Sequence, residues 1–330
     1  MLKDSMRNKK ILVTGATGFI GSHLVELLIK KGLNVTAFDR YNTNYNLGCL
    51  SNSIYKRDIN FIFGDIRDYD SVYKASKDKD IILHLAALVG IPYSYYSPLA
   101  YIKTNIEGTY NILEASKTLN TKQIIVTSTS ETYGSAIEVP IKENHRLIGQ
   151  SPYSASKISA DQLSISYWKS YKLPVKIIRP FNTFGPRQSS RAVIPSIIYQ
   201  ALNNKNIKLG NINTTRDYTY VTDICDAYVK LLNIKNIYGE PINVGSNNEF
   251  KIIDIAKKII KQINPKLKII IEKKRIRPSQ SEVQRLKCNN KMILKKSSWR
   301  PNVSFENGLK RTIDWIRSNK KLENPNIYRV

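Results

Sequence analysis

The stretch VTGATGFIG at residues 13–21 decides the fold of this 330-residue chain. It continues the apolar run KILVT at residues 10–14, which is typical of a strand buried on both faces of a sheet. A helical pattern of leucines follows. Gly15 and Gly18 permit a tight turn and close approach of the backbone to a pyrophosphate, and Gly21 permits close packing of helix on strand. The stretch therefore predicts a strand, a turn and a helix that together bind a dinucleotide.

The residue at the end of the next expected strand indicates which dinucleotide binds. Asp39 closes the run LNVTAFD, 18 residues after Gly21. A carboxylate at this place can accept hydrogen bonds from both ribose hydroxyls and would repel a 2′-phosphate. The sequence therefore favours NAD, while the neighbouring Arg40 leaves NADP open as the alternative.

Strand and helix patterns alternate through the first half of the chain. Further strands are expected at residues 33–39, 59–65, 80–86, 122–129 and 174–180, with helices at about 67–78, 98–119 and 152–172. Alternation at this length predicts βαβ units. The expected fold class is therefore α/β, with a Rossmann-type, doubly wound parallel sheet.

The alternation breaks after Pro180. The remaining chain mixes short strands with a proline-interrupted helix at 192–203 and amphipathic helices at 252–262 and 306–317. We expect a smaller, mixed α/β C-terminal substrate lobe. The predicted division assigns residues 7–178, plus roughly 215–248, to the cofactor-binding domain, and residues 179–214 and 249–330 to the lobe.

Composition excludes several classes of protein. With 42% hydrophobic residues the chain can bury a full core, which excludes a disordered or low-complexity protein. Its three cysteines and three histidines show no ligand spacing, so we expect neither a disulfide framework nor a metal site. The sequence shows no signal-peptide pattern and no stretch long enough to cross a bilayer. We therefore expect a soluble cytoplasmic chain without a membrane partner.

The formal net charge of +26 has three interpretations. Its excess of Lys and Arg over Asp and Glu is concentrated in residues 251–330, and such a basic region could attract nucleic acid. No zinc finger, recognition-helix pattern or aromatic–basic platform accompanies it. We attribute the charge mainly to lysines on solvated helix faces and expect no nucleic-acid partner. Attraction of a small diphosphate ligand is the third interpretation.

A second group of residues is suited to acid–base chemistry. Ser151 and Pro152 of SPYSASK are typical of an N-cap and a first helical residue, so Tyr153 and Lys157 are expected one turn apart on one helix face. A phenol titrates at about pH 10 and is a poor base at neutral pH. A nearby ammonium and a nicotinamide cation would favour the phenolate. Thr129 precedes this pair in STSETYG.

These motifs together resemble the extended short-chain dehydrogenase/reductase family of nucleotide-sugar enzymes. The resemblance rests on TGATGFIG, Asp39, GDIRD with Asp65 and Ile66, HLAA at 84–87, NIEGT at 105–109, Thr129, Tyr153, Lys157 and RPFNTFGPR. It covers the chain from Lys10 to about Ile316. The order and spacing of the motifs are more specific than any one of them.

Within this family the residue two places after Thr129 separates reaction types. A C4 epimerase needs only the Tyr153/Lys157 pair. A 4,6-dehydratase needs a carboxylate that takes the C5 proton and helps to expel the C6 hydroxyl as water. Glu131 supplies one, and its triplet with Thr129 and Ser130 is similar to that of GDP-mannose 4,6-dehydratases. UDP-glucuronate decarboxylases can carry the same triplet, although their tyrosine usually lies in a YDEGK context.

Four longer stretches are most similar to dehydratases that act on nucleotide-linked N-acetylglucosamine in legionaminic-acid-type pathways. They are LAALVGIPYSYYSP (85–98), SPYSASKISAD (151–161), RPFNTFGPRQSSRAVIPSII (179–198) and RIRPSQSEVQRL (275–286). The resemblance implies bound NAD and a 4-keto-6-deoxy product on a GDP carrier, with UDP as the alternative. The product would feed bacterial surface glycans or nonulosonic acids.

The resemblance also implies the site residues. Tyr153 would take the C4 hydroxyl proton, Lys157 would lower the tyrosine pKa, and Thr129 would hold the C4 oxygen. Glu131 would act as base and acid at C5 and C6, because Ser130 replaces a separate acid. The implied cofactor contacts are Gly15, Thr17, Gly18, Phe19, Ile20, Gly21, Asp39, Arg40, Asp65, Ile66, Leu85, Ala86, Ala87, Asn105, Thr127, Tyr153, Lys157 and Phe181. The implied substrate contacts are Pro92, Tyr93, Ser94, Asn182, Arg191, Pro195, Arg216 and Arg277.

The same resemblance implies a homodimer held by a four-helix bundle. The expected apolar contacts between the subunits are Tyr110, Ile112, Leu113, Leu163, Ile165 and Trp168. Two alternative enzymes remain, a UDP-N-acetylhexosamine C4 epimerase and a UDP-glucuronate decarboxylase. An alternative from another class is an NAD-sensing regulator that binds nucleic acid. The presence of all four residues expected for catalysis, Thr129, Glu131, Tyr153 and Lys157, argues against that regulator.

Overall fold

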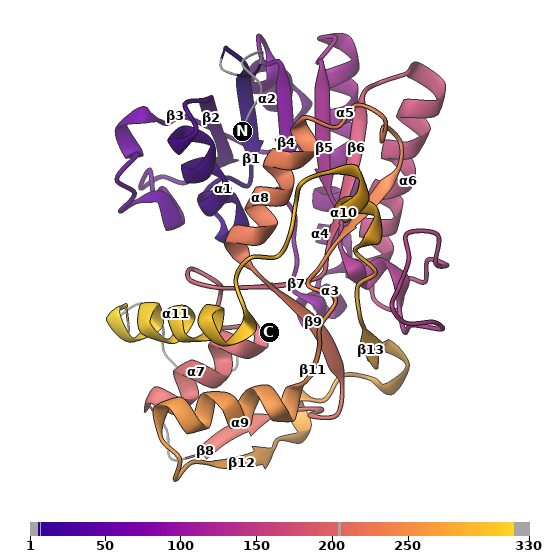
Figure 1. Ribbon diagram of the computed structural model, residues 1–330. Helices are drawn as coiled ribbons and strands as arrows, with labels where there is room; N and C mark the ends of the chain where they lie inside the picture. Colours follow the sequence, from indigo (N-terminus) through magenta and orange to yellow (C-terminus); the bar gives the residue numbers. More distant parts are fainter. Residues whose placement is uncertain (1–5, 7, 204–205, 320–330) are drawn as a thin grey trace.

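The computed structural model describes residues 6, 8–203 and 206–319, and its centre is a seven-stranded sheet (Figure 1). All neighbouring strands in it are parallel, in the order β10-β6-β5-β4-β1-β2-β3. Their bounds are β1 Lys10–Thr14, β2 Asn34–Arg40, β3 Asn60–Gly64, β4 Ile81–His84, β5 Gln123–Thr127, β6 Val175–Pro180 and β10 Pro241–Val244. The predicted Rossmann-type parallel sheet is confirmed.

Helices cover both faces of this sheet because its buried strands are apolar on both sides. Ile11 and Val13 point to one face and belong to the core formed with α1 and α8. Leu12 points to the other face and belongs to the core formed with α2, α5 and α6. The bounds of these helices are α1 Phe19–Lys30, α2 Tyr69–Ser76, α5 Gly108–Thr118, α6 Pro152–Tyr171 and α8 Val221–Leu232.

The strand order places a ligand crevice at a defined edge of the sheet. The chain runs outward from β1 through β2 to β3 on one side, and from β4 through β5 to β6 on the other. In such sheets the crevice lies outside the carboxyl ends of the strands where the direction of winding reverses, here between β1 and β4. The glycine turn after β1 and the segment after β4 therefore meet at this edge.

The smaller lobe is built around β9 and lies below the main sheet in Figure 1. Strand β9 pairs in parallel with β7 and β13 and antiparallel with β11, and a separate pair joins β8 to β12. The bounds are β7 Asn182–Phe184, β8 Asn206–Leu209, β9 Thr215–Tyr220, β11 Glu249–Lys251, β12 Lys268–Ile271, β13 Arg285–Leu286, α7 Val193–Asn203, α9 Ile252–Ile263, α10 Lys291–Lys296 and α11 Phe305–Ser318. The predicted boundary is therefore wrong for β9, which pairs within the lobe and not with the cofactor-binding sheet.

Short helices connect β4 to α5. They are α3 (Ile91–Tyr96), α4 (Pro98–Tyr101) and a π-helical segment (Ile102–Glu107). In α5 the side chains of Ile112 and Leu113 are fully buried against the chain's own sheet. These two residues cannot contact a partner subunit, which corrects that part of the expected bundle.

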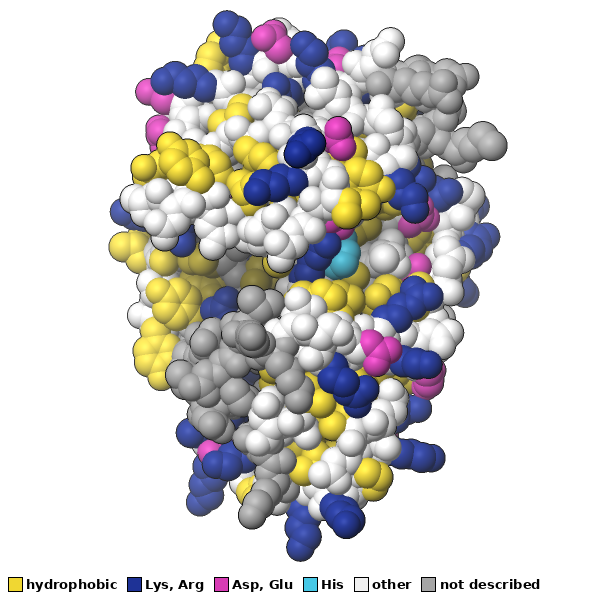
Figure 2. Space-filling view, turned by 90° about the vertical axis from the view of Figure 1, so that its left-hand side faces the viewer, with side chains coloured by type: hydrophobic (Ala, Val, Ile, Leu, Met, Phe, Trp, Pro, Cys, Tyr) yellow, Lys and Arg dark blue, Asp and Glu magenta, His cyan; other side chains and the backbone are white. Residues whose placement is uncertain are grey.

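The positive charge is distributed over the surface. On the face drawn in Figure 2, Lys and Arg side chains are spread over the upper and lower parts of the molecule, with few acidic side chains among them. They are not gathered into one stripe on this face.

Candidate active site

The turn after β1 leaves the backbone open where a dinucleotide would lie. Gly15 has a φ of +65°, and a Cβ there would come within 2.8 Å of the Ala86 backbone. A Cβ on Gly21 would lie 2.1 Å from the carbonyl oxygen of Gly15. Only glycine fits these two positions, and α1 begins directly after the turn, so the predicted cradle for a pyrophosphate is present.

Asp39, near the end of β2, faces this turn. Its Oδ2 accepts hydrogen bonds from the backbone nitrogen of Thr17 at 2.8 Å and from the Thr17 hydroxyl at 2.6 Å. Its Oδ1 accepts a hydrogen bond from the backbone nitrogen of Arg40 at 2.8 Å. The carboxylate therefore fixes the glycine turn as well as facing the expected ribose position, a role that the sequence did not indicate.

Two further predicted cofactor residues hold neighbouring segments in place. The Asn105 amide exchanges two hydrogen bonds with the backbone of Leu88, at 2.9 and 3.0 Å, and donates to the Ser156 hydroxyl at 2.9 Å. Asp65 accepts hydrogen bonds from Arg67, whose guanidinium holds the pKa of that carboxyl below its usual range. Asn105 thus joins the segment after β4 to α6, beside the expected nicotinamide position.

Phe181, another predicted cofactor residue, is packed within the protein. Its side chain is 2% exposed and packs in an apolar cluster with Tyr133 and Ile141. Its backbone nitrogen donates a hydrogen bond to the Val244 carbonyl at 2.8 Å. The ring and the backbone N–H of Phe181 are therefore engaged within the protein, and its contact with the cofactor stays a prediction.

Helix α6 presents the predicted acid–base pair. Ser151 caps the helix through a reciprocal capping box with Ser154, so Tyr153 and Lys157 lie in its first turns, and both are buried. The Lys157 ammonium donates a hydrogen bond to the carbonyl oxygen of Thr127, at the end of β5, at 2.6 Å. This bond fixes the pair at the carboxyl edge of the sheet.

Burial changes the protonation of both groups. It raises the pKa of the Tyr153 phenol above its ordinary value, an effect that hydrogen bonding with the Thr129 side chain offsets in part. It lowers the pKa of Lys157 to about 8, against the attraction of Asp161. The chain by itself therefore favours the protonated phenol, and a phenolate requires a further positive charge beside it.

The turn after β5 brings the third predicted group to the same place. It is a 3₁₀ turn over Ser130–Tyr133, and the Thr129 hydroxyl accepts a hydrogen bond from the Glu131 backbone nitrogen at 3.2 Å. The Glu131 carboxylate lies 4.0 Å from Nε of Arg216, and its charge acts on Tyr153. Thr129, Glu131 and Tyr153 therefore share one site.

Two predicted substrate arginines meet at a carboxylate that the sequence analysis did not single out. Arg216 Nη2 and Arg277 Nη1 lie 3.4 and 3.6 Å from Oε1 of Glu282. Tyr218 is buried beside both arginines and Glu131. Strand alternation along RDYTYV could have placed Tyr218 on the face of Arg216. No local pattern marks Glu282.

The segment IPYSYY closes another side of the site. Ile91 and Tyr101 pack with Tyr153 in one apolar cluster, while Tyr93 remains 39% exposed and Pro92 is half-buried. These placements agree with a site wall. In the same helix, Ser94 is fully buried and its hydroxyl donates to the backbone carbonyl at the start of α3 at 2.7 Å. Its prediction as a substrate contact is therefore wrong.

Three predicted substrate residues come from the chain that leads from β6 into α7. A Cβ on Gly90 would lie 3.9 Å from Nη1 of Arg191, so this arginine reaches the start of α3. The Oδ1 atom of Asn182 is buried without a hydrogen-bond partner among the described residues. Pro195 is buried in α7.

Two kinds of feature are absent from the described part of the chain. Across residues 6, 8–203 and 206–319, no group of three or more His, Cys, Asp or Glu residues is arranged to hold a metal ion. No described helix combines the length and the apolar character that a membrane span requires.

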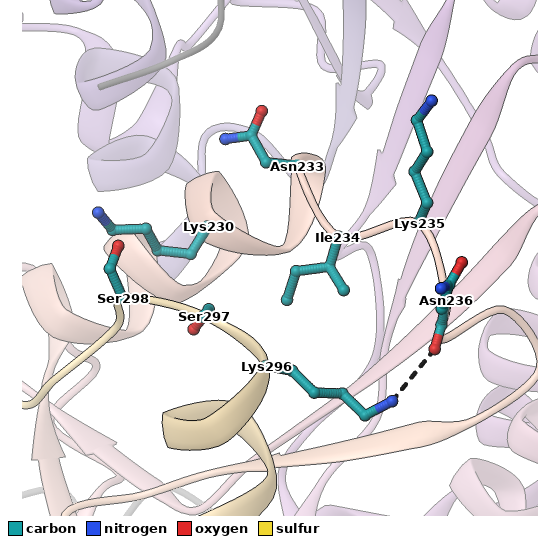
Figure 3. A pocket seen from close by; sticks show the side chains of 8 residues that line it. All are labelled: Lys230, Asn233, Ile234, Lys235, Asn236, Lys296, Ser297 and Ser298. Carbon is teal, nitrogen blue, oxygen red and sulfur yellow. Dashed lines mark hydrogen bonds between the residues drawn. The ribbon is translucent and has the colours of Figure 1, made fainter.

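A surface pocket of about 580 Å³ lies away from the catalytic cluster, where α8 and α10 both end (Figure 3). Lys230, Lys235 and Lys296 are among its lining residues, and none of the described residues that line it is acidic. Lys230 and Lys296 stand in the last turns of α8 and α10, where a cation complements the carbonyl end of the helix. The helix ends therefore explain the presence of Lys230 and Lys296. None of the predicted site residues lines this pocket.

Comparison with known proteins identifies the family. The chain matches the family described as GDP-mannose 4,6 dehydratase over residues 12–312. The chain belongs to this family. It is 38% identical over 280 residues to a dTDP-D-glucose 4,6-dehydratase of Dictyostelium discoideum, a match that covers 78% of this chain and spans only 63% of that protein. It is 33% identical to a UDP-N-acetyl-alpha-D-glucosaminuronate decarboxylase of Bacillus cytotoxicus, covering 94% of this chain and 98% of that protein.

A solved member of the family supports the cofactor prediction. The dTDP-glucose 4,6-dehydratase DesIV of Streptomyces venezuelae, solved with NAD bound, has a TM-score of 0.87 and 27% identity, covering 96% of this chain and 99% of that chain. The cofactor of this chain is NAD, and its glycine turn and Asp39 fit it. Because dehydratases and a decarboxylase occur among these relatives, family membership alone does not select the reaction.

Proposed function

We propose that the chain is an NAD-dependent 4,6-dehydratase of N-acetylglucosamine linked to GDP, with UDP as the alternative carrier. The observation that carries the proposal is the position of Glu131 beside Thr129 and Tyr153. Exchange of configuration at C4 uses the tyrosine–lysine pair alone. Removal of water across C5 and C6 requires the additional carboxylate.

The first part of the reaction occurs at C4. Tyr153, as the phenolate, removes the proton of the C4 hydroxyl, and Thr129 donates a hydrogen bond that orients the C4 oxygen. Lys157, anchored to the Thr127 carbonyl, and the nicotinamide cation of bound NAD would together provide the positive charge that favours the phenolate. NAD, which the glycine turn and Asp39 would hold, would accept the hydride lost from C4 and return it to C6 after water has left.

The second part occurs at C5 and C6. A ketone at C4 acidifies the C5 proton, and Glu131 removes it. The protonated Glu131 then assists departure of the C6 hydroxyl as water. Ser130 is buried at 2% exposure and has no acidic group, so one carboxylate serves both steps in this proposal.

The remaining contacts position the nucleotide and the subunits. Arg216 and Arg277 bind the diphosphate through their planar guanidinium groups. The product supplies surface-glycan or nonulosonic-acid synthesis in the cytoplasm. We also propose a homodimer in which α5 and α6 of two chains pack together. Tyr110, which is 44% exposed, and the half-buried Leu163, Ile165 and Trp168 then provide the apolar contacts.

Mass spectrometry of the purified protein incubated separately with GDP- and UDP-N-acetylglucosamine, without added reductant, tests the reaction. Loss of one water from either compound is expected and names the carrier. Glu131→Gln should abolish this loss while NAD remains bound. An unchanged mass with a new C4 epimer by NMR would identify an epimerase. Loss of carbon dioxide from UDP-glucuronate would identify a decarboxylase, and either result would refute the proposal.

A further inference from the structure

Gln150 lies where three segments of the chain meet. Its Nε2 donates a hydrogen bond to the Gln280 carbonyl at 2.9 Å, and its Oε1 accepts one from the backbone nitrogen of Ser135. Its own carbonyl oxygen accepts a hydrogen bond from the Ser281 hydroxyl at 2.6 Å. One residue thus holds three hydrogen bonds to segments that are remote from one another in the sequence.

Each of these segments carries part of the active site. The segment of Ser135 continues the turn that bears Glu131. Gln150 itself directly precedes the N-cap of α6, the helix that bears Tyr153. The third segment runs between Arg277 and Glu282, the two residues that meet in the arginine cluster. Gln150 therefore connects both catalytic groups to the expected diphosphate site.

A fourth contact extends this junction to α3. The Tyr95 hydroxyl lies 2.5 Å from the Ser281 hydroxyl, and Ser281 is 8% exposed. Since Ser281 donates its proton to Gln150, Tyr95 acts as the donor to Ser281. The wall formed by IPYSYY is thereby joined to the same segment.

The position of the Gln150 side chain is tightly constrained. Gly134 has a φ of +64°, and a Cβ there would lie 2.6 Å from Oε1 of Gln150. A residue with a side chain at position 134 would displace the amide. The absence of a side chain at Gly134 therefore leaves the space that the Gln150 amide occupies.

We propose that Gln150 is a positioning residue that keeps the segment Arg277–Glu282 in register with Glu131 and Tyr153. It touches neither the reacting sugar nor the cofactor in this proposal. It acts by fixing the distance between the arginine that binds the diphosphate and the groups that act on the sugar. The inference depends on the proposed function only in taking a nucleoside diphosphate as the ligand of the arginines.

Loss of this junction should weaken binding of the nucleotide and misplace the sugar. Without it, the segment keeps the longer contacts of Glu282, and its C-terminal end stays attached to β9 through Gln284 and β13. A loosened segment must be ordered when the diphosphate binds, which lowers affinity. A small displacement of the sugar from Glu131 and Tyr153 also lowers the turnover rate.

Gln150→Glu removes the hydrogen bond from Gln150 Nε2 to the Gln280 carbonyl, which joins the two lobes. The carboxylate keeps an oxygen that can accept from Ser135, but it places an oxygen in front of the Gln280 carbonyl in place of the Nε2 donor. Tyr95→Phe removes the donor on the other side of Ser281. Gln162→Glu, on the exposed face of α6, is the matched control for the change of charge.

The measurements are the affinity of each NAD-loaded variant for GDP and for UDP by calorimetry, with kcat, KM, NAD content and melting temperature. Gln150→Glu and Tyr95→Phe are expected to lower nucleoside diphosphate affinity by about 3- to 10-fold, the effect of one or two neutral hydrogen bonds. Their NAD content and melting temperature should match those of Gln162→Glu. In Gln150→Glu, kcat should also fall.

Two results with these variants would overturn the inference while leaving the proposed function intact. One is unchanged nucleotide affinity and kcat/KM in both Gln150→Glu and Tyr95→Phe. The other is a parallel loss of NAD content and melting temperature, which would show a merely structural role. A wild-type protein that binds neither nucleotide would overturn the proposed function, and the inference with it.

Discussion

Two arginine–carboxylate clusters lie beside the catalytic residues, and they are built differently. Arg179 and Asp161 are 2% and 0% exposed, and Nη2 and Nε of the arginine lie 2.9 and 3.0 Å from one carboxylate oxygen. Arg216 and Arg277 share the single carboxylate of Glu282 at 3.4 and 3.6 Å. The first cluster pairs one charge with one charge at close range, whereas in the second the two arginines lie at 3.4–4.0 Å from the carboxylates of Glu282 and Glu131.

This difference separates the closed cluster of Arg179 and Asp161, which is suited to a structural role, from the open cluster of Arg216, Arg277 and Glu282, which is suited to a ligand. Ser128 donates to Asp161 at 2.8 Å, and Arg179 donates to the Tyr133 hydroxyl at 3.0 Å, so the buried pair is embedded in a hydrogen-bonded network. Removing one partner of a buried ion pair of this kind strongly destabilises the fold. The second cluster can exchange the weak contacts of Glu282 for the oxygens of a diphosphate, which suit the planar guanidinium.

Asp161→Ala should give the largest loss of stability. The substitution leaves the Arg179 guanidinium buried without its carboxylate, and we expect the free energy of unfolding to fall by about 3–5 kcal/mol. Urea denaturation measures this change. Asp314→Ala is the control, because Asp314 pairs with Arg317 at 3.7 Å with both side chains about half exposed, and its loss should be about 0.5 kcal/mol or less. Equal losses in the two variants would refute the distinction.

The glycine turn resembles the closed cluster in one respect: contacts within the protein determine its shape. Gly15 and Gly32 both have positive φ, at +65° and +77°, but only Gly15 has backbone atoms where a Cβ would stand. Alanine at either position incurs a similar conformational cost of about 1–2 kcal/mol. Gly15→Ala should in addition lower NAD affinity on the order of 100-fold, because the turn must move away from Ala86. Titration of the cofactor-free variants with NAD compares them, and an equal effect of Gly32→Ala on NAD affinity would contradict this account.

The parts of the fold and the site that could be predicted rest on neighbouring residues. The glycine turn, the Tyr153/Lys157 helix and the Thr129/Glu131 turn are each contained in a few consecutive residues, whose spacing determines their local geometry. Arrangement of these segments at one edge then followed from the parallel sheet. The structure agrees with each of these expected placements.

The parts that could not be predicted depend on distant partners. Glu282 reaches Arg216 across 66 positions of sequence, and Gln150 reaches Gln280 across 130. A motif also marks a position without giving the direction of its side chain. The family resemblance predicts Ser94 in the substrate site, but its hydroxyl is used within α3. Strand β9 was assigned to the wrong domain for a related reason, since a short strand carries no signal of its pairing partner.

Arg216→Gln tests the open cluster. Removing the guanidinium should lower the affinity of the NAD-loaded protein for GDP or UDP by about tenfold, since charged hydrogen bonds to the diphosphate are lost while Arg277 remains. The free energy of unfolding should change by less than about 1 kcal/mol, because Glu282 keeps its other partner. Calorimetry and urea denaturation give the two values. A loss of stability as large as that of Asp161→Ala would place Arg216 among the structural residues.

Asp161 of the closed cluster also acts on the charge of Lys157. Burial lowers the pKa of Lys157 to about 8, and the attraction of Asp161 opposes this shift. Between this value and the ordinary lysine pKa of about 10.4, the unfolded chain holds a proton that the folded chain has lost, so the free energy of unfolding rises with pH. Lys157→Met lacks this titration. From about pH 7.5 to about pH 9, the wild type should therefore gain roughly 1 kcal/mol relative to Lys157→Met. Urea denaturation at several pH values measures the gap, with Lys169→Met on the exposed face of α6 as the control for loss of a lysine. A gap that stays constant would mean that the pKa of Lys157 is not lowered in the folded chain, and that the attraction of Asp161 fully offsets the effect of burial.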